Sequence, residues 1–166
     1  MGAVAGDGGV CRVILPHYAM DDLLAMLAWE HAGAERDDAP FETLVELSRA
    51  YFNGQVVDFS PAGCDLPAAG TFTGAVYRSC REIPHGQTMS YSGLARKIGR
   101  EDAARAVATA MSKNPVPLVV PCHRVVYADG SPGGFSAAGG EALKARMLEL
   151  ERRAAGRARG DSVTSH

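Results

Sequence analysis

The chain has 166 residues, of which 46% are hydrophobic and 22% are charged, and its formal net charge is −2. This length suits one domain of ordinary size, or two small lobes, with enough apolar content for a core. No apolar run is long enough to span a membrane and the N-terminus lacks a signal-peptide pattern, so we expect a cytoplasmic protein (nuclear if eukaryotic) without a membrane partner.

The first half of the chain predicts a small lobe of short strands and helices. Apolar residues at helical spacing alternate there with short β-branched runs and with breaks rich in Gly or Pro. The expected elements are, in order, a frayed start (1–9), a strand (11–16), two helices (21–33 and 40–54), a strand (55–60) and a linker (61–70). We therefore place a lobe boundary near residue 70.

The second half predicts a mostly helical lobe. Ser90 can cap a short helix that Gly99 can end, and the next helix follows after almost no loop, which is typical of a helix-turn-helix. The expected elements are four helices (71–83, 90–99, 101–114 and 141–151), a Gly- and Ser-rich loop (128–140) and an Arg-rich, disordered tail (152–166). The predicted fold class is α+β, with a small acidic N-terminal α/β lobe followed by this helical lobe.

Charge is distributed unevenly along the chain. Residues 1–70 hold 3 Lys or Arg against 11 Asp or Glu, whereas residues 71–159 hold 14 against 7. A basic half indicates a surface that faces a polyanion, although two lobes of opposite charge can also simply attract each other. The Ala-rich segment 101–114 carries a lone Arg105 near its middle, and its small side chains permit close approach either to DNA or to the protein core.

The four cysteines are scattered, without the paired Cys or His spacing of a zinc site, and we expect free thiols and no metal. Cys122 and His123 follow the stretch NPVPLVVP (114–121). Its three prolines exclude a helix, and its β-branched residues favour extended backbone. The sequence therefore predicts that Cys122 and His123 lie on a rigid, extended segment at the edge of the core.

Cys122 is a candidate nucleophile, because a cysteine attacks as its thiolate and the neighbouring His123 can serve as a base. Adjacent side chains of an extended segment point to opposite faces, so a bridging water would be needed between them. A carboxylate usually orients such a histidine, and the candidates are Glu149, Glu151, Glu82, Glu101, Asp102 and Glu141. On the residues alone, a buried structural thiol is the commoner explanation of this dipeptide.

The segment ARAVATAMSKNPVPLVVPCHRVV (104–126) resembles the active-site region of the O6-alkylguanine-DNA alkyltransferases, also called methylated-DNA–protein-cysteine methyltransferases. The resemblance extends from about Phe72 to Glu151 and includes HGQTMSY (85–91) and KARMLELE (144–151). In the first seventy residues, the segment that most resembles the family is YFNGQVVDF (51–59). The expected organisation is an N-terminal lobe (1–70), a DNA-binding and catalytic domain (71–154) and a disordered tail (155–166).

The resemblance implies direct DNA repair in a single turnover. Cys122 would irreversibly accept the alkyl group from O6-alkylguanine in duplex DNA, with His123 acting as a base through a water and Glu151 orienting the histidine. Asn114 would brace the turn around the active site. Tyr91 would help to rotate the target nucleotide and would donate a proton towards the leaving guanine. No metal or organic cofactor is implied.

The resemblance also implies a DNA interface and a substrate pocket. Arg105 would fill the space of the flipped base, while its helix lies in the minor groove of double-stranded DNA. The other implied DNA contacts are Ala104, Ala106, Thr73, Tyr91 and Arg124, and the implied pocket residues are Met111, Pro117, Phe135 and Ser136. The protein is expected to act as a monomer.

Three features depart from the family pattern. Ala108 stands where the family has Gly, the loop after Phe135 is longer than in many relatives, and the first lobe is short. A non-catalytic damage sensor of the same fold would carry another residue at the position of Cys122, and an ordinary helix-turn-helix regulator would carry more Arg, Asn or Gln on its reading helix. A cysteine hydrolase is a third alternative, but nothing in the sequence suggests an oxyanion hole.

Overall fold

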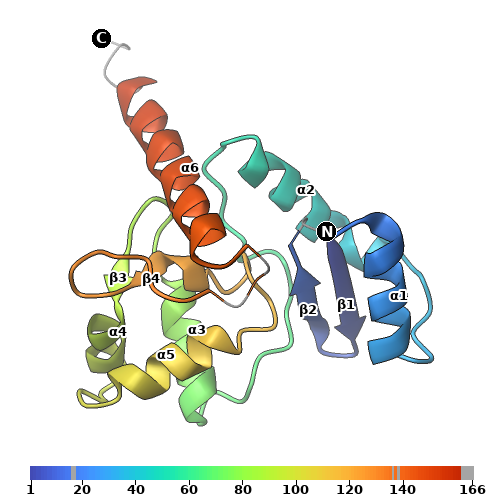
Figure 1. Cartoon of the computed structure of the whole chain (residues 1–166), viewed down its shortest axis with the longest axis horizontal. Helices are drawn as coiled ribbons and strands as arrows, with labels where there is room; N and C mark the ends of the chain where they lie inside the picture. Colours follow the sequence, from blue (N-terminus) through green and yellow to red (C-terminus); the bar gives the residue numbers. More distant parts are fainter. Residues whose placement is uncertain (16–17, 136, 138, 162–166) are drawn as a thin grey trace.

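The structure is a computed structural model that describes residues 1–15, 18–135, 137 and 139–161. Figure 1 shows a strand hairpin and two helices on one side of the molecule and a mostly helical lobe on the other. The architecture is therefore α+β, as the sequence predicts. None of the described helices is long and apolar enough to cross a membrane.

The N-terminal lobe begins with an antiparallel hairpin of β1 (Gly2–Gly6) and β2 (Gly9–Ile14). The expectation that residues 1–9 are frayed is wrong, because β1 is paired along its whole length with β2. The helices that follow are α1 (Met20–Glu30), the 3-10 turn η1 (Ala39–Phe41) and α2 (Glu42–Phe52). Both predicted helices of this lobe are therefore present, with shorter bounds.

Residues 55–60 do not form the predicted strand. Their alternation is real, since Val57 and Phe59 are buried while Val56 is 54% exposed. However, the Val57 amide donates to the His85 ring at 3.5 Å rather than to a neighbouring strand. The alternation therefore arises because this segment packs one side against the second lobe, although it does not join a sheet.

In the part of the C-terminal lobe that the structure describes there are four α-helices: α3 (Phe72–Arg81), α4 (Tyr91–Lys97), α5 (Ala104–Ser112) and α6 (Gly140–Asp161). Two short strands of this lobe, β3 (Met89–Ser90) and β4 (Val125–Val126), pair with each other in parallel. Ser90 caps α4 by accepting from the Gly93 amide, as predicted. Gly99, with φ of 69°, turns the chain between α4 and α5, which gives the predicted helix-turn-helix its tight connection.

Helix α6 corrects the expectation of a disordered tail from residue 152 or 155. It continues to Asp161, and its end projects from the body of the protein in Figure 1. Ala and Arg are good helix formers, and Glu149 bonds to Arg152 and Arg153 one turn further along the helix. Residues 162–166 of the expected tail lie outside the described residues.

The two lobes share one hydrophobic core. Leu44 and Tyr51 of the first lobe belong to the same buried cluster as Val76 and Leu94 of the second. A backbone hydrogen bond of 2.8 Å from the Val13 amide to the Pro115 carbonyl also ties β2 to the segment before Cys122. The N-terminal lobe is thus docked directly against the candidate site.

Candidate functional site

The segment that carries Cys122 is folded into turns, which corrects the predicted extended conformation. Leu118 adopts a φ of 76°, and Cys122–Arg124 form a 3-10 turn, η2, before β4 begins. Such a φ is costly for a leucine and persists only where surrounding contacts impose it. The three prolines did exclude an α-helix here, but the turn they permit depends on side-chain contacts that the sequence pattern does not predict.

Asn114 supplies those contacts. Its amide nitrogen donates to the Val120 carbonyl at 2.8 Å and to the Cys122 sulfur at 3.1 Å, while its carbonyl oxygen accepts from the Val116 amide at 3.1 Å. All of these groups are buried. Asn114 therefore closes the turn and fixes the position of the sulfur at the same time.

The Cys122 thiol is protonated in the resting protein. Burial raises its pKa, and the hydrogen bond from Asn114 and the charge of Lys144 only partly oppose this effect. A protonated thiol is a poor nucleophile, so attack by Cys122 requires a base that removes its proton.

Replacing Asn114 with Ala is expected to raise the pKa of Cys122 further, because the thiolate loses its hydrogen-bond donor. The variant should also lose about 1–3 kcal/mol of stability, because the buried Val120 carbonyl loses a partner. The pH dependence of Cys122 alkylation by iodoacetamide measures the first effect, and chemical denaturation measures the second. Asn53→Ala, at the exposed end of α2, is the control; equal alkylation profiles in both variants would contradict the role of Asn114.

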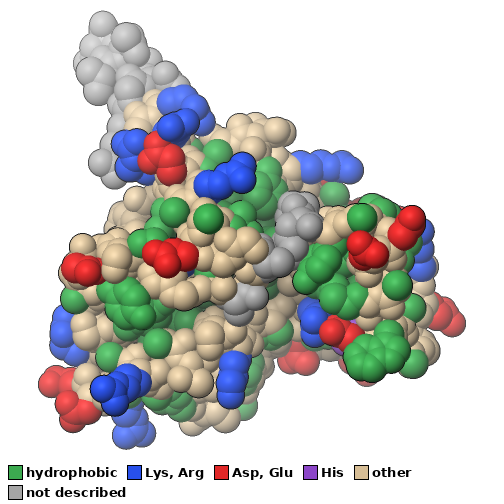
Figure 2. All heavy atoms as spheres, viewed as in Figure 1, with side chains coloured by type: hydrophobic (Ala, Val, Ile, Leu, Met, Phe, Trp, Pro, Cys, Tyr) green, Lys and Arg blue, Asp and Glu red, His purple; other side chains and the backbone are tan. Residues whose placement is uncertain are grey.

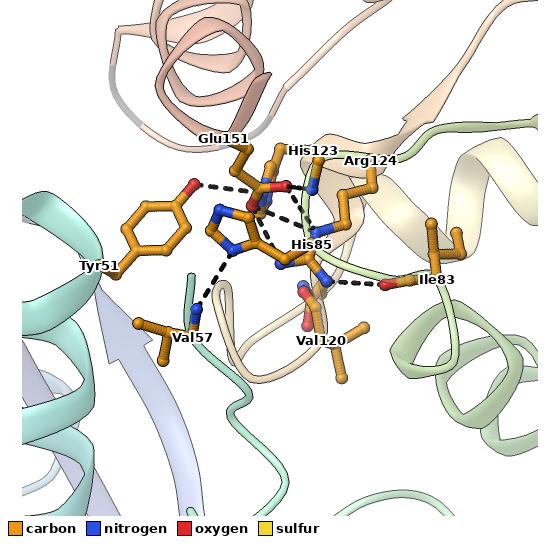
Figure 3. Close-up of polar contacts among 10 residues, drawn as sticks. Tyr51, Val57, Ile83, His85, Val120, His123, Arg124 and Glu151 are labelled. Atoms are coloured by element: carbon orange, nitrogen blue, oxygen red, sulfur yellow. Dashed lines mark hydrogen bonds and ion pairs between the residues drawn. The ribbon is translucent and has the colours of Figure 1, made fainter. Parts of the chain in front are cut away.

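His123, which follows Cys122 in the sequence, forms a buried pair with Glu151 (Figure 3). The His123 Nε2 atom lies 2.7 Å from the Glu151 carboxylate, and the Gly86 amide donates to the same carboxylate at 2.8 Å. Gly86 has a φ of 76°, and a Cβ atom there would lie 2.8 Å from the Ala155 side chain. Of the six carboxylates that the sequence leaves open, the structure thus places Glu151 on the histidine.

The charges of this pair follow from its surroundings. Burial alone would raise the pKa of Glu151, but the hydrogen bond from His123 and the ion pair with Arg124 outweigh burial, and the pKa is lowered. Burial lowers the pKa of His123, and this effect outweighs the hydrogen bond and the charge of Glu151, which act to raise the pKa. A neutral His123 therefore donates from Nε2 to an ionised Glu151 and keeps its lone pair on Nδ1, which has no hydrogen-bond partner among the residues that the structure describes.

Arg124 has an internal role, which corrects the expectation that it contacts DNA. It is only 6% exposed. Its Nε and Nη2 atoms donate to Glu151 at 2.9 and 3.0 Å, and its Nη1 atom donates to the Ile83 carbonyl at 2.7 Å. The guanidinium is therefore committed to holding Glu151 and is not presented to a phosphate.

Tyr91 and Lys144 form a second buried pair near Cys122. Burial raises the pKa of Tyr91 to about 12, so its hydroxyl stays protonated. The Lys144 ammonium donates to this hydroxyl at 3.3 Å and to the Val125 carbonyl at 2.6 Å. Sequence reasoning missed Lys144, although it lies on the buried stripe of α6 at helical spacing from Met147 and Glu151.

Cys122 is among the residues that line a cavity of about 290 Å³. Asn114, Pro117 and Phe135 line it, as expected for the last two, and the N-terminal lobe contributes further wall residues, among them Arg12, Tyr18 and Met26. Met111, also predicted for the pocket, is instead buried in the core, and Ser136 lies outside the described residues. Among the described residues, no cluster of His, Cys, Asp or Glu is placed to hold a metal ion.

Three of the predicted DNA-contact residues, Ala104, Arg105 and Ala106, lie at the start of α5, and Thr73 lies on α3. Arg105 and Ala106 are exposed, while Ala104 and Thr73 are half-buried. Figure 2 shows Lys and Arg side chains along the edge of the lobe that α4 and α5 form. Ala108 is half-buried and packs against the core.

Known proteins resemble this chain across both lobes. The family model described as "6-O-methylguanine DNA methyltransferase, DNA binding domain" matches residues 71–153. A methylated-DNA–protein-cysteine methyltransferase of Methanothermobacter thermautotrophicus is 33% identical over 151 residues, which cover 91% of this chain and 78% of that protein. One of Mycolicibacterium paratuberculosis is 42% identical over 114 residues, covering 68% of this chain and 66% of that protein.

A solved structure supports the same assignment. The crystal structure of Mycobacterium tuberculosis OGT in complex with DNA is similar with a TM-score of 0.74 and 30% sequence identity, over 92% of this chain and 86% of that one. The segment that the family model matches contains Asn114, Cys122, His123 and Glu151. This chain therefore belongs to the 6-O-methylguanine DNA methyltransferase family.

Proposed function

We propose that this protein repairs O6-alkylguanine in double-stranded DNA by transferring the alkyl group irreversibly to Cys122. The observation that carries the proposal is that Cys122 lines a cavity and its sulfur is held by Asn114, while His123, the next residue, is paired with the buried Glu151. The cysteine itself favours a transferase over a damage sensor of the same fold. Because the sulfur–carbon bond of the S-alkylcysteine product is not readily broken, each molecule acts once.

The chemistry starts with removal of the thiol proton. His123, with its lone pair on Nδ1, takes this proton through a water, and Glu151 stabilises the imidazolium that forms. The thiolate then attacks the alkyl carbon in line, so that the sulfur–carbon bond forms as the bond from carbon to O6 breaks. The electron pair of that bond leaves with the guanine.

Tyr91 is suited to neutralise the leaving guanine. Its hydroxyl oxygen accepts from Lys144 at 3.3 Å, so its own hydrogen can be donated to the base. The Lys144 ammonium then stabilises the phenolate that remains and can return a proton to it. Burial lowers the pKa of Lys144, which makes that return easier.

The target base must leave the helix to reach a buried sulfur, and flipping costs a few kcal/mol. We propose that α5 lies in the minor groove and that Arg105 fills the space of the flipped base. Exposed Ala106 and half-buried Ala104 permit the close approach, and the basic lobe attracts phosphates regardless of sequence. The protein would do this as a monomer.

The test is the intact mass of the protein after incubation with a duplex that holds a single O6-methylguanine. A gain of one methyl group at one equivalent of DNA, located on the peptide with Cys122, is the expected result. Tight and selective binding without any gain in mass would overturn the proposal and would indicate a damage sensor.

Arg105→Ala is expected to slow transfer from duplex DNA about tenfold, because the flipped state loses the side chain that fills the stack. Transfer from the free base O6-benzylguanine should be unchanged, because no flipping is required. Single-turnover rates with both substrates measure the difference. Arg36→Ala removes an equal charge from the exposed surface of the N-terminal lobe and serves as the control. Equal losses on both substrates in Arg105→Ala would contradict the role of Arg105.

A further inference from the structure

Tyr51 brings the N-terminal lobe into contact with the candidate base. It lies on α2 in the segment YFNGQVVDF, and its side chain is completely buried. Its hydroxyl oxygen is 3.3 Å from the Nε2 atom of His123, and the two rings meet edge to face with centroids 6.2 Å apart. Figure 3 shows the Tyr51 hydroxyl reaching the His123–Glu151 pair from the opposite side to Arg124.

The direction of these hydrogen bonds follows from the protonation states. Burial first, and then the Glu151 carboxylate, raise the pKa of Tyr51, so its hydroxyl keeps its proton. His123 donates from Nε2 to Glu151, so the Tyr51 oxygen, at 3.3 Å from the same nitrogen, is placed to share that hydrogen.

We propose that Tyr51 is a positioning residue, which fixes the tautomer and orientation of His123 from the N-terminal lobe. This inference rests on the proposed function, in which His123 is the base. It gives the short first lobe a part in the chemistry, because α2 then adds a residue to the cluster of His123, Arg124 and Glu151, which comes from the second lobe.

Several charged or titratable groups face His123, and the test must leave them in place. They are Glu151 and Lys144 on α6, Arg124 on η2, and His85, whose ring packs against Tyr51 with centroids 5.8 Å apart. Tyr51→Phe removes only the hydroxyl. The edge contacts of the ring with Phe52 and Phe59, at 5.2 and 5.9 Å between centroids, remain and preserve the packing.

Tyr51→Phe is expected to lower the pKa of His123, because the imidazolium loses an oxygen that is placed to accept from Nε2. The rate of methyl transfer at neutral pH should fall about 5- to 10-fold, the scale of one lost hydrogen bond. NMR titration of the His123 ring in the full chain measures the pKa, and a pH profile of single-turnover transfer measures the rate.

Tyr77→Phe is the matched control. Tyr77 is also buried, and its hydroxyl donates to the Ala110 carbonyl at 3.0 Å, away from the His123–Glu151 pair. It should lose similar stability while His123 keeps its pKa. An unchanged His123 pKa in Tyr51→Phe, or an equal shift in Tyr77→Phe, would overturn the role of Tyr51. Failure of the unaltered protein to accept a methyl group would overturn the proposed function instead, and the titration distinguishes the two results.

Discussion

Cys122→Ala is expected to abolish methyl transfer from an O6-methylguanine duplex. The rate should fall by about 1,000-fold or more, which is the typical effect of removing a covalent nucleophile. The other three cysteines offer no substitute. Burial raises the pKa of Cys80 well above its usual range, and neither Cys11 nor Cys64 is among the residues that line the described cavity. Transfer of a labelled methyl group in a single turnover is the measurement.

The fold and the DNA affinity of Cys122→Ala should stay close to those of the unaltered protein. Removal of one sulfur leaves a small cavity that costs about 1 kcal/mol, and α5 is not altered. Fluorescence anisotropy with a labelled duplex checks the affinity. Cys80→Ala deletes an equally buried thiol and should still accept the methyl group. Persistent transfer by Cys122→Ala would show that another residue is the nucleophile.

The helices of this protein were predictable because their signals are local. Ser90 and Gly99 mark the limits of α4, and apolar residues at helical spacing mark α2 and α3. The hairpin escaped prediction because β1 is rich in Gly and Ala, and only its pairing with β2 makes it a strand. The turn around Leu118 escaped for a similar reason, since Asn114 imposes it through side-chain hydrogen bonds.

In the site, too, residues that are close in sequence could be predicted, whereas contacts between residues far apart in sequence could not. The Asn114–Cys122–His123 motif is continuous in sequence, so the resemblance could identify it. The resemblance implies that Arg124 contacts DNA, but its side chain is held by Glu151, which lies 27 residues away in the sequence. Tyr51 is 72 residues from His123, and only the packing of the two lobes brings the pair together.

Glu151→Gln is expected to destabilise the protein by about 3–5 kcal/mol, because it leaves the buried Arg124 guanidinium without its counter-charge. Transfer should slow as well, since the imidazolium of His123 loses the charge that stabilises it. Urea denaturation gives the free energy of unfolding, and single-turnover kinetics give the rate.

The stability loss has a defined pH dependence. The pKa of Glu151 is lowered in the folded protein, so its contribution is present above the unfolded pKa, about 4.3, and is lost as the pH falls through the folded pKa. A protonated Glu151 resembles a glutamine in charge. The difference in unfolding free energy between the unaltered protein and Glu151→Gln should therefore shrink as the pH is lowered below about 4.3.

Glu149→Gln provides the control on the same helix. Glu149 is partly exposed, and Arg152 and Arg153 bond to it at the surface, where such pairs contribute about 0–1 kcal/mol. Its loss should leave methyl transfer unchanged. Equal destabilisation by the two substitutions would mean that Glu151 acts as an ordinary helix residue. A Glu151→Gln variant that is destabilised but transfers at the normal rate would confine Glu151 to holding Arg124 and would leave the orientation of His123 to Tyr51.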